Sequence, residues 1–333
     1  MPCVVDAKLR ESDTSADPAS QPRRSSLSTV AEYGHPRGRD RRACGVLAAL
    51  LLSASFGALA QPASVRAGYT LTADIPYATI DGHELKLDLY LPSSAKNPPL
   101  LVWVHGGRWL RRSKADILTT AFVEDGYAMA SLDFRLSPDA KFPAQIHDIK
   151  GGIRFLRAQA AQFGYDATRI GILGSSSGGH LVALVGTTNG HRGLEGTVGG
   201  YQDYSSDVQA IVSYYGASNL TTILAQSTPF GVGERAPALE LLLGGLPEQQ
   251  VALARLASPV FHVDVQDPPL LLLHGDQDPQ MPINQAHELH GAYKAHGLQA
   301  HFDVVHGAEH GGPQFVDDER NRLVREFLDK HLR

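Results

Sequence analysis

From residue 69 onward, the chain shows two kinds of hydrophobic pattern. Residues 69–80 and 84–91 alternate apolar and polar side chains, and they flank Asp81 and Gly82, a pair that favours a tight turn. These two segments predict an antiparallel hairpin. Beyond residue 99, short runs are apolar at nearly every position, which is typical of strands covered on both faces of a parallel sheet. The runs comprise residues 100–105, 127–133, 170–174, 208–215, 270–274 and 300–305.

Segments with the three-to-four-residue spacing of helices separate these runs. They comprise residues 116–125, 146–163, 178–185, 282–295 and 317–332. Strands that alternate with helices predict an α/β fold with a mostly parallel central sheet, an antiparallel N-terminal hairpin and helices on both faces. Residues 218–246 are too long for a plain connection. They indicate either a small lid that faces the substrate or an excursion on the surface.

The first 60 residues differ from the rest. Residues 1–42 are rich in Ser, Pro, Asp and Arg, and we expect a disordered N-terminal extension. The apolar stretch within 43–60 is shorter than the ~20 residues that span a bilayer and ends in small residues, so it predicts a signal peptide. We therefore expect a single mature domain, residues 61–333, secreted or periplasmic and without stable membrane insertion after cleavage. An uncleaved anchor is the alternative.

Composition and charge narrow the classes of function. The 333-residue chain is 43% hydrophobic and 20% charged, as in ordinary globular proteins. Its formal net charge of −5 gives no basic surplus for phosphate, so no nucleic-acid partner is expected. Cys3 and Cys44 both lie in the segment expected to be removed. The mature chain would then have no thiolate nucleophile and no cysteine ligand for a metal.

The strongest chemical motif follows the apolar run 170–174. It is Gly174-Ser175-Ser176-Ser177-Gly178, and a predicted helix begins directly after it. Glycines on both sides of a serine permit a sharp turn from strand to helix, and the positive end of the helix favours developing negative charge. Ser176, in the middle of the turn, is the predicted nucleophile. A plain Gly/Ser turn is the alternative.

A second motif follows the run 100–105. Gly106 and Gly107 come directly after His105, and backbone N–H groups in a glycine turn can approach an oxyanion without a side chain in the way. We predict an oxyanion hole formed by the N–H groups of Gly106, Gly107 and Ser177. His105 is expected to brace the loop by hydrogen bonding.

Two further loops offer an acid and a base. Asp276 and Asp278 follow the run 270–274, and His306 and His310 follow the run 300–305. A triad needs its acid on a loop beyond a strand end and its base on a loop that overlies the nucleophile. We predict Asp278 and His310 for these roles and Asp276 as a loop cap. The order Ser, Asp, His along the chain is that of α/β-hydrolases.

One motif also matches a zinc peptidase pattern. His306, Glu309 and His310 form H-x-x-E-H, which binds zinc when the histidines share a helical face. Gly307 and Pro313 disfavour a helix here. We therefore expect no metal here.

Taken together, these stretches resemble the hormone-sensitive-lipase-like and feruloyl-esterase-like (BD-FAE type) branch of the α/β-hydrolases, which also includes kynurenine formamidase-like enzymes. The resemblance rests on HGGRW at 105–109, DFRLS at 133–137, FPAQ at 142–145 with Asp148, GSSSGGH at 174–180, HGDQDPQMP at 274–282 and GAEHG at 307–311. It implies the α/β-hydrolase fold and the same triad and oxyanion donors. Arg108 departs from the third glycine of many relatives, and Ser175 from their usual acidic residue. Arg108 is expected either to narrow the acyl pocket or to contact an anion.

The resemblance implies ester hydrolysis without a cofactor. We expect a serine carboxylesterase acting on short-chain or aromatic acyl esters, either small molecules or polysaccharide-linked, with Arg108, Trp109 and Tyr215 as candidate substrate contacts. A peptidase or amidase on the same fold is one alternative. A ligand-binding relative that has lost the chemistry is another.

Overall fold

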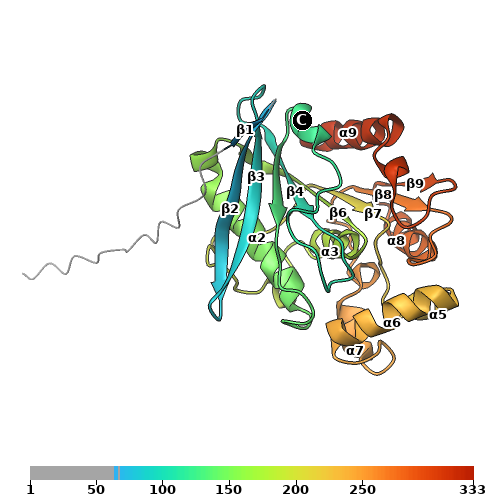
Figure 1. The fold of residues 1–333 in the computed structure, drawn as a ribbon. Coiled ribbons are helices and arrows are strands. Elements are labelled where there is room, and N and C mark those ends of the chain that lie inside the picture. The colour runs from blue at the N-terminus through green and yellow to red at the C-terminus, as the bar shows by residue number, and fades with distance from the viewer. Residues whose placement is uncertain (1–63, 67) are drawn as a thin grey trace, which may run out of the picture. The chain divides into compact units, whose positions relative to one another are not determined.

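The computed structural model describes residues 64–66 and 68–333 (Figure 1). The expected N-terminal extension, the expected signal peptide and both cysteines lie outside the described residues. Within the described part, no helix has the length and apolar character needed to cross a bilayer.

A nine-stranded sheet runs through the described residues in the order β1-β2-β3-β5-β4-β6-β7-β8-β9. The neighbours β1–β2, β2–β3 and β3–β5 are antiparallel. All the neighbours that follow in this order, from β5–β4 to β8–β9, are parallel. The predicted hairpin and the mostly parallel sheet are therefore confirmed. The strands are β1 Ser64–Arg66, β2 Tyr69–Ile80, β3 His83–Pro92, β4 Pro99–Val104, β5 Ala128–Leu132, β6 Asp166–Ser175, β7 Ala210–Tyr214, β8 Leu270–Gly275 and β9 Ala300–Val305.

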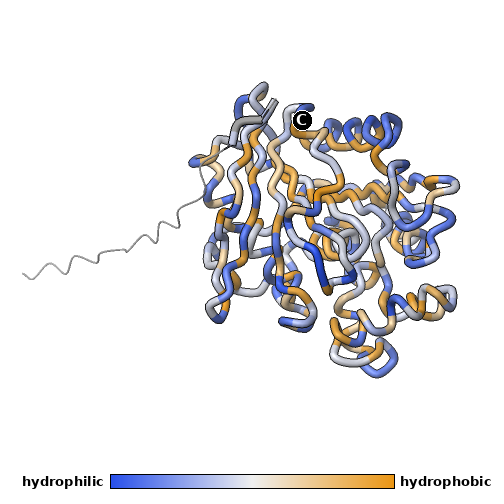
Figure 2. Tube along the Cα trace, viewed as in Figure 1, coloured by the Kyte–Doolittle hydropathy of each residue, from blue (hydrophilic) through white to orange (hydrophobic). Residues whose placement is uncertain are grey.

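Helices cover both faces of this sheet because alternate strand residues point to opposite sides. In β4, Val102 packs in one core with helices α2 Ala144–Phe163, α3 Ser177–Gly186 and α8 Asn284–Ala295. Its neighbour Trp103 packs in a second core with α1 Ala121–Glu124 and α9 Asp318–Leu332. Figure 2 shows the apolar residues concentrated along the central strands and the polar ones on loops and outer helix faces.

The prediction of a helix over residues 116–125 is wrong for residues 116–120. Only Ala121–Glu124 is helical, and residues 116–120 are irregular with a bend at Leu118. In a helix the carbonyl of Asp116 would accept from the N–H four residues later. Here that carbonyl accepts the indole N–H of Trp103 at 2.9 Å instead. A tertiary hydrogen bond thus replaces the first helical turn.

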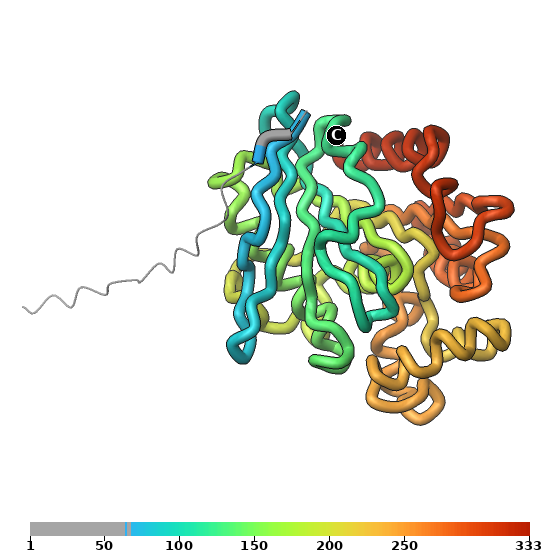
Figure 3. The backbone as a smooth tube through the Cα atoms, viewed as in Figure 1, coloured from blue at the N-terminus to red at the C-terminus, as the bar shows by residue number. Residues whose placement is uncertain are grey.

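The stretch between β7 and β8 is more helical than its sequence pattern predicts. It contains α5 Ile223–Gln226, α6 Pro229–Leu243, α7 Val251–Leu256 and the 3₁₀ turn Pro259–Phe261, seen as the yellow-to-orange tube in Figure 3. The Thr228 side chain accepts the N–H of Gly231 and begins α6. Gly244 ends it in the left-handed conformation. Two short elements, α4 Arg192–Glu195 and the 3₁₀ turn Pro313–Phe315, lie elsewhere.

Candidate active site

Ser176 occupies a sharp turn between β6 and α3. Its backbone has φ 55° and ψ −119°, a strained conformation for a residue with a side chain. The turn is possible because residue 178 is a glycine and has no side chain. A Cβ there would lie 2.1 Å from the carbonyl oxygen of Val104. The Ser176 N–H donates to the Tyr214 carbonyl at 2.9 Å, which anchors the turn to β7. The predicted strand–turn–helix context of the serine is thus present.

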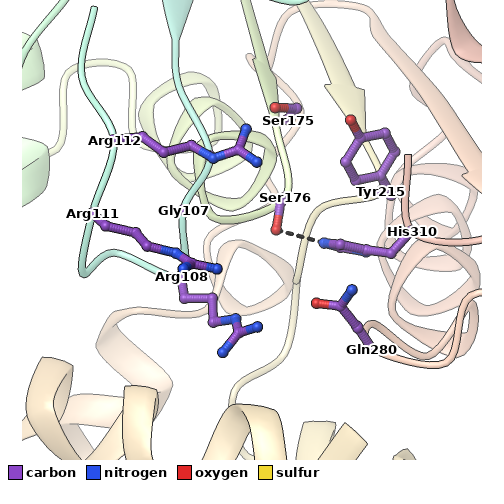
Figure 4. Close-up of a pocket in the computed structure, with 10 residues that line it drawn as sticks. Gly107, Arg108, Arg111, Arg112, Ser175, Ser176, Tyr215, Gln280 and His310 are labelled. Atoms are coloured by element: carbon purple, nitrogen blue, oxygen red, sulfur yellow. Dashed lines mark hydrogen bonds between the residues drawn. The ribbon is translucent and has the colours of Figure 1, made fainter. Parts of the chain in front are cut away.

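Three predicted residues meet at this turn. The Oγ of Ser176 lies 2.8 Å from Nε2 of His310 (Figure 4). Nδ1 of His310 lies 2.6 Å from Oδ2 of Asp278. The other oxygen of Asp278 accepts the backbone N–H groups of Gln280 and Met281, each at 2.8 Å. The carboxylate is therefore held in one orientation, and it orients the imidazole in turn.

A second aspartate–histidine pair lies on the same two loops. Nδ1 of His306 is 2.8 Å from Oδ2 of Asp276, and Asp276 also accepts the N–H of Gly307. The His306 side chain is 83% exposed, whereas that of His310 is only 11% exposed. Asp276 therefore ties the two loops together at the surface, away from Ser176, in keeping with the predicted loop cap.

Burial and charge set the protonation states of the acid and base. Burial acts to raise the pKa of Asp278, but hydrogen bonds from His274 and His310 outweigh it and hold the pKa well below its ordinary value. Burial lowers the pKa of His310, and the positive charge of Arg235 lowers it further, while Asp278 opposes both. At neutral pH the acid is ionised and the imidazole is neutral, as a general base must be.

The predicted oxyanion donors lie around the same serine. Gly106 is so close that a Cβ there would be 3.3 Å from Cβ of Ser176, and Gly107 has φ 113°. Ser177 is the first residue of α3, directly after the nucleophile position. His105 braces this turn as the sequence predicts, because its Nδ1 is 2.7 Å from the Gly106 carbonyl and its ring stacks on Phe134.

A pocket of about 170 Å³ opens above Ser176. Of the expected substrate contacts, Arg108 and Tyr215 line it, and the Tyr215 ring centroid lies 4.9 Å from that of His310. Trp109 does not line it. This side chain is fully buried, and its indole N–H donates to Nδ1 of His180 at 3.2 Å. Trp109 therefore supports the loop from behind, which corrects the expectation of a substrate contact.

Sequence reasoning missed four residues of this region. Arg111, Arg112 and Gln280 line the pocket, and Arg235 of α6 places Nη2 3.4 Å from Nε2 of His310. The arginines that follow the glycine turn were visible as a cluster within five positions. Arg235 gave no such signal, because its helix was not predicted.

The zinc-like pattern does not gather its residues in space. His306 and His310 contact different aspartates, and the segment between them is a turn rather than a helix. Among the described residues, no group of three or more potential ligands is arranged to hold a metal ion.

A mostly parallel sheet with a serine at the sharp turn after β6, an aspartate after β8 and a histidine after β9 defines the α/β-hydrolase class. The BD-FAE family model matches residues 87–293, more than half of the chain, and the chain belongs to this family. The resemblance read from the motifs is thereby confirmed.

Several proteins that are named esterases are similar to this chain in sequence. Esterase LipQ of Mycobacterium tuberculosis is 32% identical over 78% of the chain, and the isoprenylcysteine α-carbonyl methylesterase ICME of Arabidopsis thaliana is 29% identical over 68%. The chain spans only 62% and 53% of the lengths of these two relatives. It also spans 45% of LipM and 47% of LipC, two further proteins of M. tuberculosis.

Two solved structures are similar to most of this chain. A truncated carbohydrate esterase from gut microbiota is 30% identical, with a TM-score of 0.73 over 81% of this chain and 99% of that one. A bifunctional GH43-CE protein of Bacteroides eggerthii is 34% identical, with a TM-score of 0.71 over 78% of this chain and 35% of that one.

Proposed function

We propose that the protein is a serine carboxylesterase that forms an acyl-enzyme intermediate on Ser176. The observation that supports this most strongly is the unbroken series of hydrogen bonds from Asp278 through His310 to the Ser176 hydroxyl. A neutral, oriented imidazole beside a serine at a strained turn is the arrangement that activates a hydroxyl for attack on a carbonyl. Relatives that are named esterases support the same reaction.

In the first half-reaction, the Ser176 Oγ bonds to the carbonyl carbon of the ester while Nε2 of His310 takes the hydroxyl proton. The carbonyl electron pair moves to oxygen, where the N–H groups of Gly106, Gly107 and Ser177 stabilise it; one such donor typically contributes ~2.7–4 kcal/mol. The intermediate then breaks its bond to the alkoxy oxygen. His310 returns the proton to that oxygen, the alcohol leaves, and the acyl group stays on Ser176.

In the second half-reaction, water takes the place of the alcohol. His310 accepts a proton from water as its oxygen bonds to the acyl carbon, and then returns a proton to Ser176 as the acid departs. Asp278 stays ionised throughout and stabilises the imidazolium. The sum is ester plus water giving acid plus alcohol, with no cofactor required.

The size and lining of the pocket support short or aromatic acyl groups. Its volume of about 170 Å³ is below the ~300–1,000 Å³ typical of sites for drug-sized ligands. Tyr215, whose ring centroid lies 4.9 Å from that of His310, provides an aromatic surface in the pocket. A small-molecule ester or an ester on a polysaccharide fits this proposal, and the second source agrees with the carbohydrate esterase among the similar structures.

The apolar segment within residues 43–60 supports the further proposal that the protein is exported. N-terminal sequencing of protein recovered from outside the cytoplasm should then begin near residue 61. Recovery of the whole chain from the cytoplasm alone would contradict export without affecting the esterase proposal.

The esterase proposal is tested by hydrolysis of p-nitrophenyl acetate. We expect Ser176→Ala and His310→Ala each to lower kcat by at least about 10³-fold, because each removes a reacting group. His306→Ala is the matched control, since it removes a histidine of the same loop that contacts Asp276 at the surface. Undiminished hydrolysis by Ser176→Ala would overturn the proposal.

A further inference from the structure

The pocket over Ser176 is strongly cationic in a chain that is acidic overall. Arg108, Arg111 and Arg112 line it, and none of the described residues that line it is an aspartate or glutamate. The formal net charge of the whole chain is −5. The pocket is thus locally positive although the chain as a whole is acidic, and a concave cationic site raises the local concentration of anions.

The three arginines differ in their contacts with the part of the chain that the structure describes. Arg108 forms an ion pair with Glu234 of α6. The side chains of Arg111 and Arg112 form no ion pair or hydrogen bond with any of the residues that the structure describes. Both side chains are exposed, so their guanidinium N–H donors are accessible to an anionic ligand in the pocket.

A fourth arginine adds an independent observation. Arg235 is fully buried, and its Nη1 has no hydrogen-bond partner among the described residues. Its Nε donates to the Gln280 carbonyl, and its Nη2 lies beside His310. A buried guanidinium is costly unless negative charge lies near it; Asp278 and Glu234 supply such charge, and the one nitrogen that stays unsatisfied is Nη1. The field that it adds has the same sign as that of the pocket arginines.

The position of the arginines indicates which part of an ester would hold the negative group. In Figure 4, the guanidinium groups of Arg108, Arg111 and Arg112 lie on one side of Ser176, and His310 lies on the other. His310 must protonate the leaving alcohol, so the alcohol departs on the histidine side. The acyl chain is then the part of the substrate that extends toward the arginines.

We infer that the protein prefers esters whose acyl chain ends in a carboxylate, that is, half-esters of short dicarboxylic acids, with Arg111 and Arg112 binding the free carboxylate. This inference rests on the proposed esterase function. Guanidinium groups match a carboxylate geometrically and can bind it through two parallel hydrogen bonds. Because the pocket is small, the acyl chain of such a half-ester can have only a few methylene groups between its two carbonyl carbons.

The test compares two substrates that differ only at the end of the acyl chain. They are p-nitrophenyl hydrogen glutarate, which ends in a carboxylate, and p-nitrophenyl pentanoate, which ends in a methyl group. After subtraction of spontaneous hydrolysis, we expect kcat/KM to be about tenfold higher for the glutarate, the size of effect expected of a charge-assisted hydrogen bond. A second pair, 4-acetoxybenzoate and 4-acetoxybenzamide, carries the charge on the alcohol side and should show no comparable preference.

The double variant Arg111→Gln/Arg112→Gln should reduce the glutarate-to-pentanoate ratio about tenfold. Arg192→Gln/Arg322→Gln removes the same charge from exposed positions outside the pocket and should leave the ratio unchanged. Equal rates on the glutarate and pentanoate in the wild type, or an equal loss on both in the double variant, would overturn the inference. So would a charge preference confined to the alcohol-side pair. If hydrolysis of the pentanoate depends on Ser176 while the preference is absent, only this inference fails and the esterase proposal stands.

Discussion

Asp276 and Asp278 stand two positions apart on one loop, yet their surroundings differ completely. Asp278 is buried, accepts two backbone N–H groups and contacts His310. Asp276 contacts His306 near the surface. Both pairs have similar hydrogen-bond lengths, so contact with a histidine alone does not define a catalytic acid. What distinguishes Asp278 is that its histidine also reaches a hydroxyl at a strained turn.

Replacement of Asp278 by Asn should therefore lower kcat by about 10³–10⁴-fold, because the amide no longer fixes the required tautomer of His310. Asp276→Asn is the matched control and should lower kcat less than about twofold. Both variants are compared on p-nitrophenyl acetate, with circular dichroism to establish that they fold. Equal losses in the two variants would contradict the assignment of the acid.

The pH profile tests the surroundings of the base. Only neutral His310 can accept the proton of Ser176, so activity falls as pH drops through the pKa of His310. Burial and Arg235 lower that pKa, which places the midpoint of the acid limb of kcat/KM below the ordinary value of 6.5. Arg235→Gln removes a nearby positive charge and should move the midpoint to higher pH. A midpoint that stays in place or moves down would show that Arg235 does not act on His310 electrostatically.

Among the elements, the turn between β6 and α3 depends most on backbone packing. A Cβ at Gly178 would lie 2.1 Å from the Val104 oxygen and 2.5 Å from the His105 oxygen. Neither backbone carbonyl can move without displacing the strand that leads to the oxyanion turn. The close approach of two backbones thus couples the nucleophile to its expected oxyanion donors.

Gly178→Ala should consequently lower the free energy of unfolding by about 3 kcal/mol or more, through overpacking. Gly291→Ala is the contrasting variant, since that glycine lies within α8 and has open space around it. It should raise the free energy of unfolding by about 0.5–1 kcal/mol through reduced chain entropy and better helix propensity. Urea unfolding of both variants measures these changes, and similar values for the two would contradict the packing argument.

The elements that the sequence predicted well are those with a local signal. The hairpin around Asp81 and the apolar strands had clear periodicity, and the glycine-flanked loops after the strands placed Ser176, Asp278 and His310 where the structure brings them together. Helix α6 lacked such a signal, because Pro237 and two glycines, Gly231 and Gly233, disfavour a helix in its sequence. Its side chain Arg235 therefore could not be foreseen beside His310. Trp109 was misassigned because sequence position alone does not reveal which way a side chain points.

At the scale of the whole molecule, the two ends of the strands have different roles. Asp278 follows β8 at the end where the candidate site lies, whereas Asp267 precedes β8 at the other end. Burial raises the pKa of Asp267 to about 7, and the neighbouring charge of Asp264 adds to this despite a backbone hydrogen bond. The folded state thus holds a proton on Asp267 that the unfolded state, with an ordinary pKa of 3.8, has already released.

The contribution of Asp267 to the free energy of unfolding should therefore decline as pH rises from about 4 to about 7, since the unfolded state binds fewer protons than the folded state across that window. Asp267→Asn removes the ionisable group. Its midpoint of thermal unfolding should exceed that of the wild type by about 2 °C or more at pH 8 and by less at pH 5. A larger difference at pH 5 than at pH 8 would contradict the assigned direction. Ester hydrolysis should be unaffected, because Asp267 lies outside the pocket.

The proposed esterase has one reactive hydroxyl, that of Ser176, which His310 activates. Labelling with a fluorophosphonate, followed by peptide mass spectrometry, tests this most directly, because the reagent bonds only to an activated nucleophile. We expect one adduct per chain, on Ser176, and none in the Ser176→Ala or His310→Ala variants. An adduct on another residue, or labelling that persists in Ser176→Ala, would contradict that expectation.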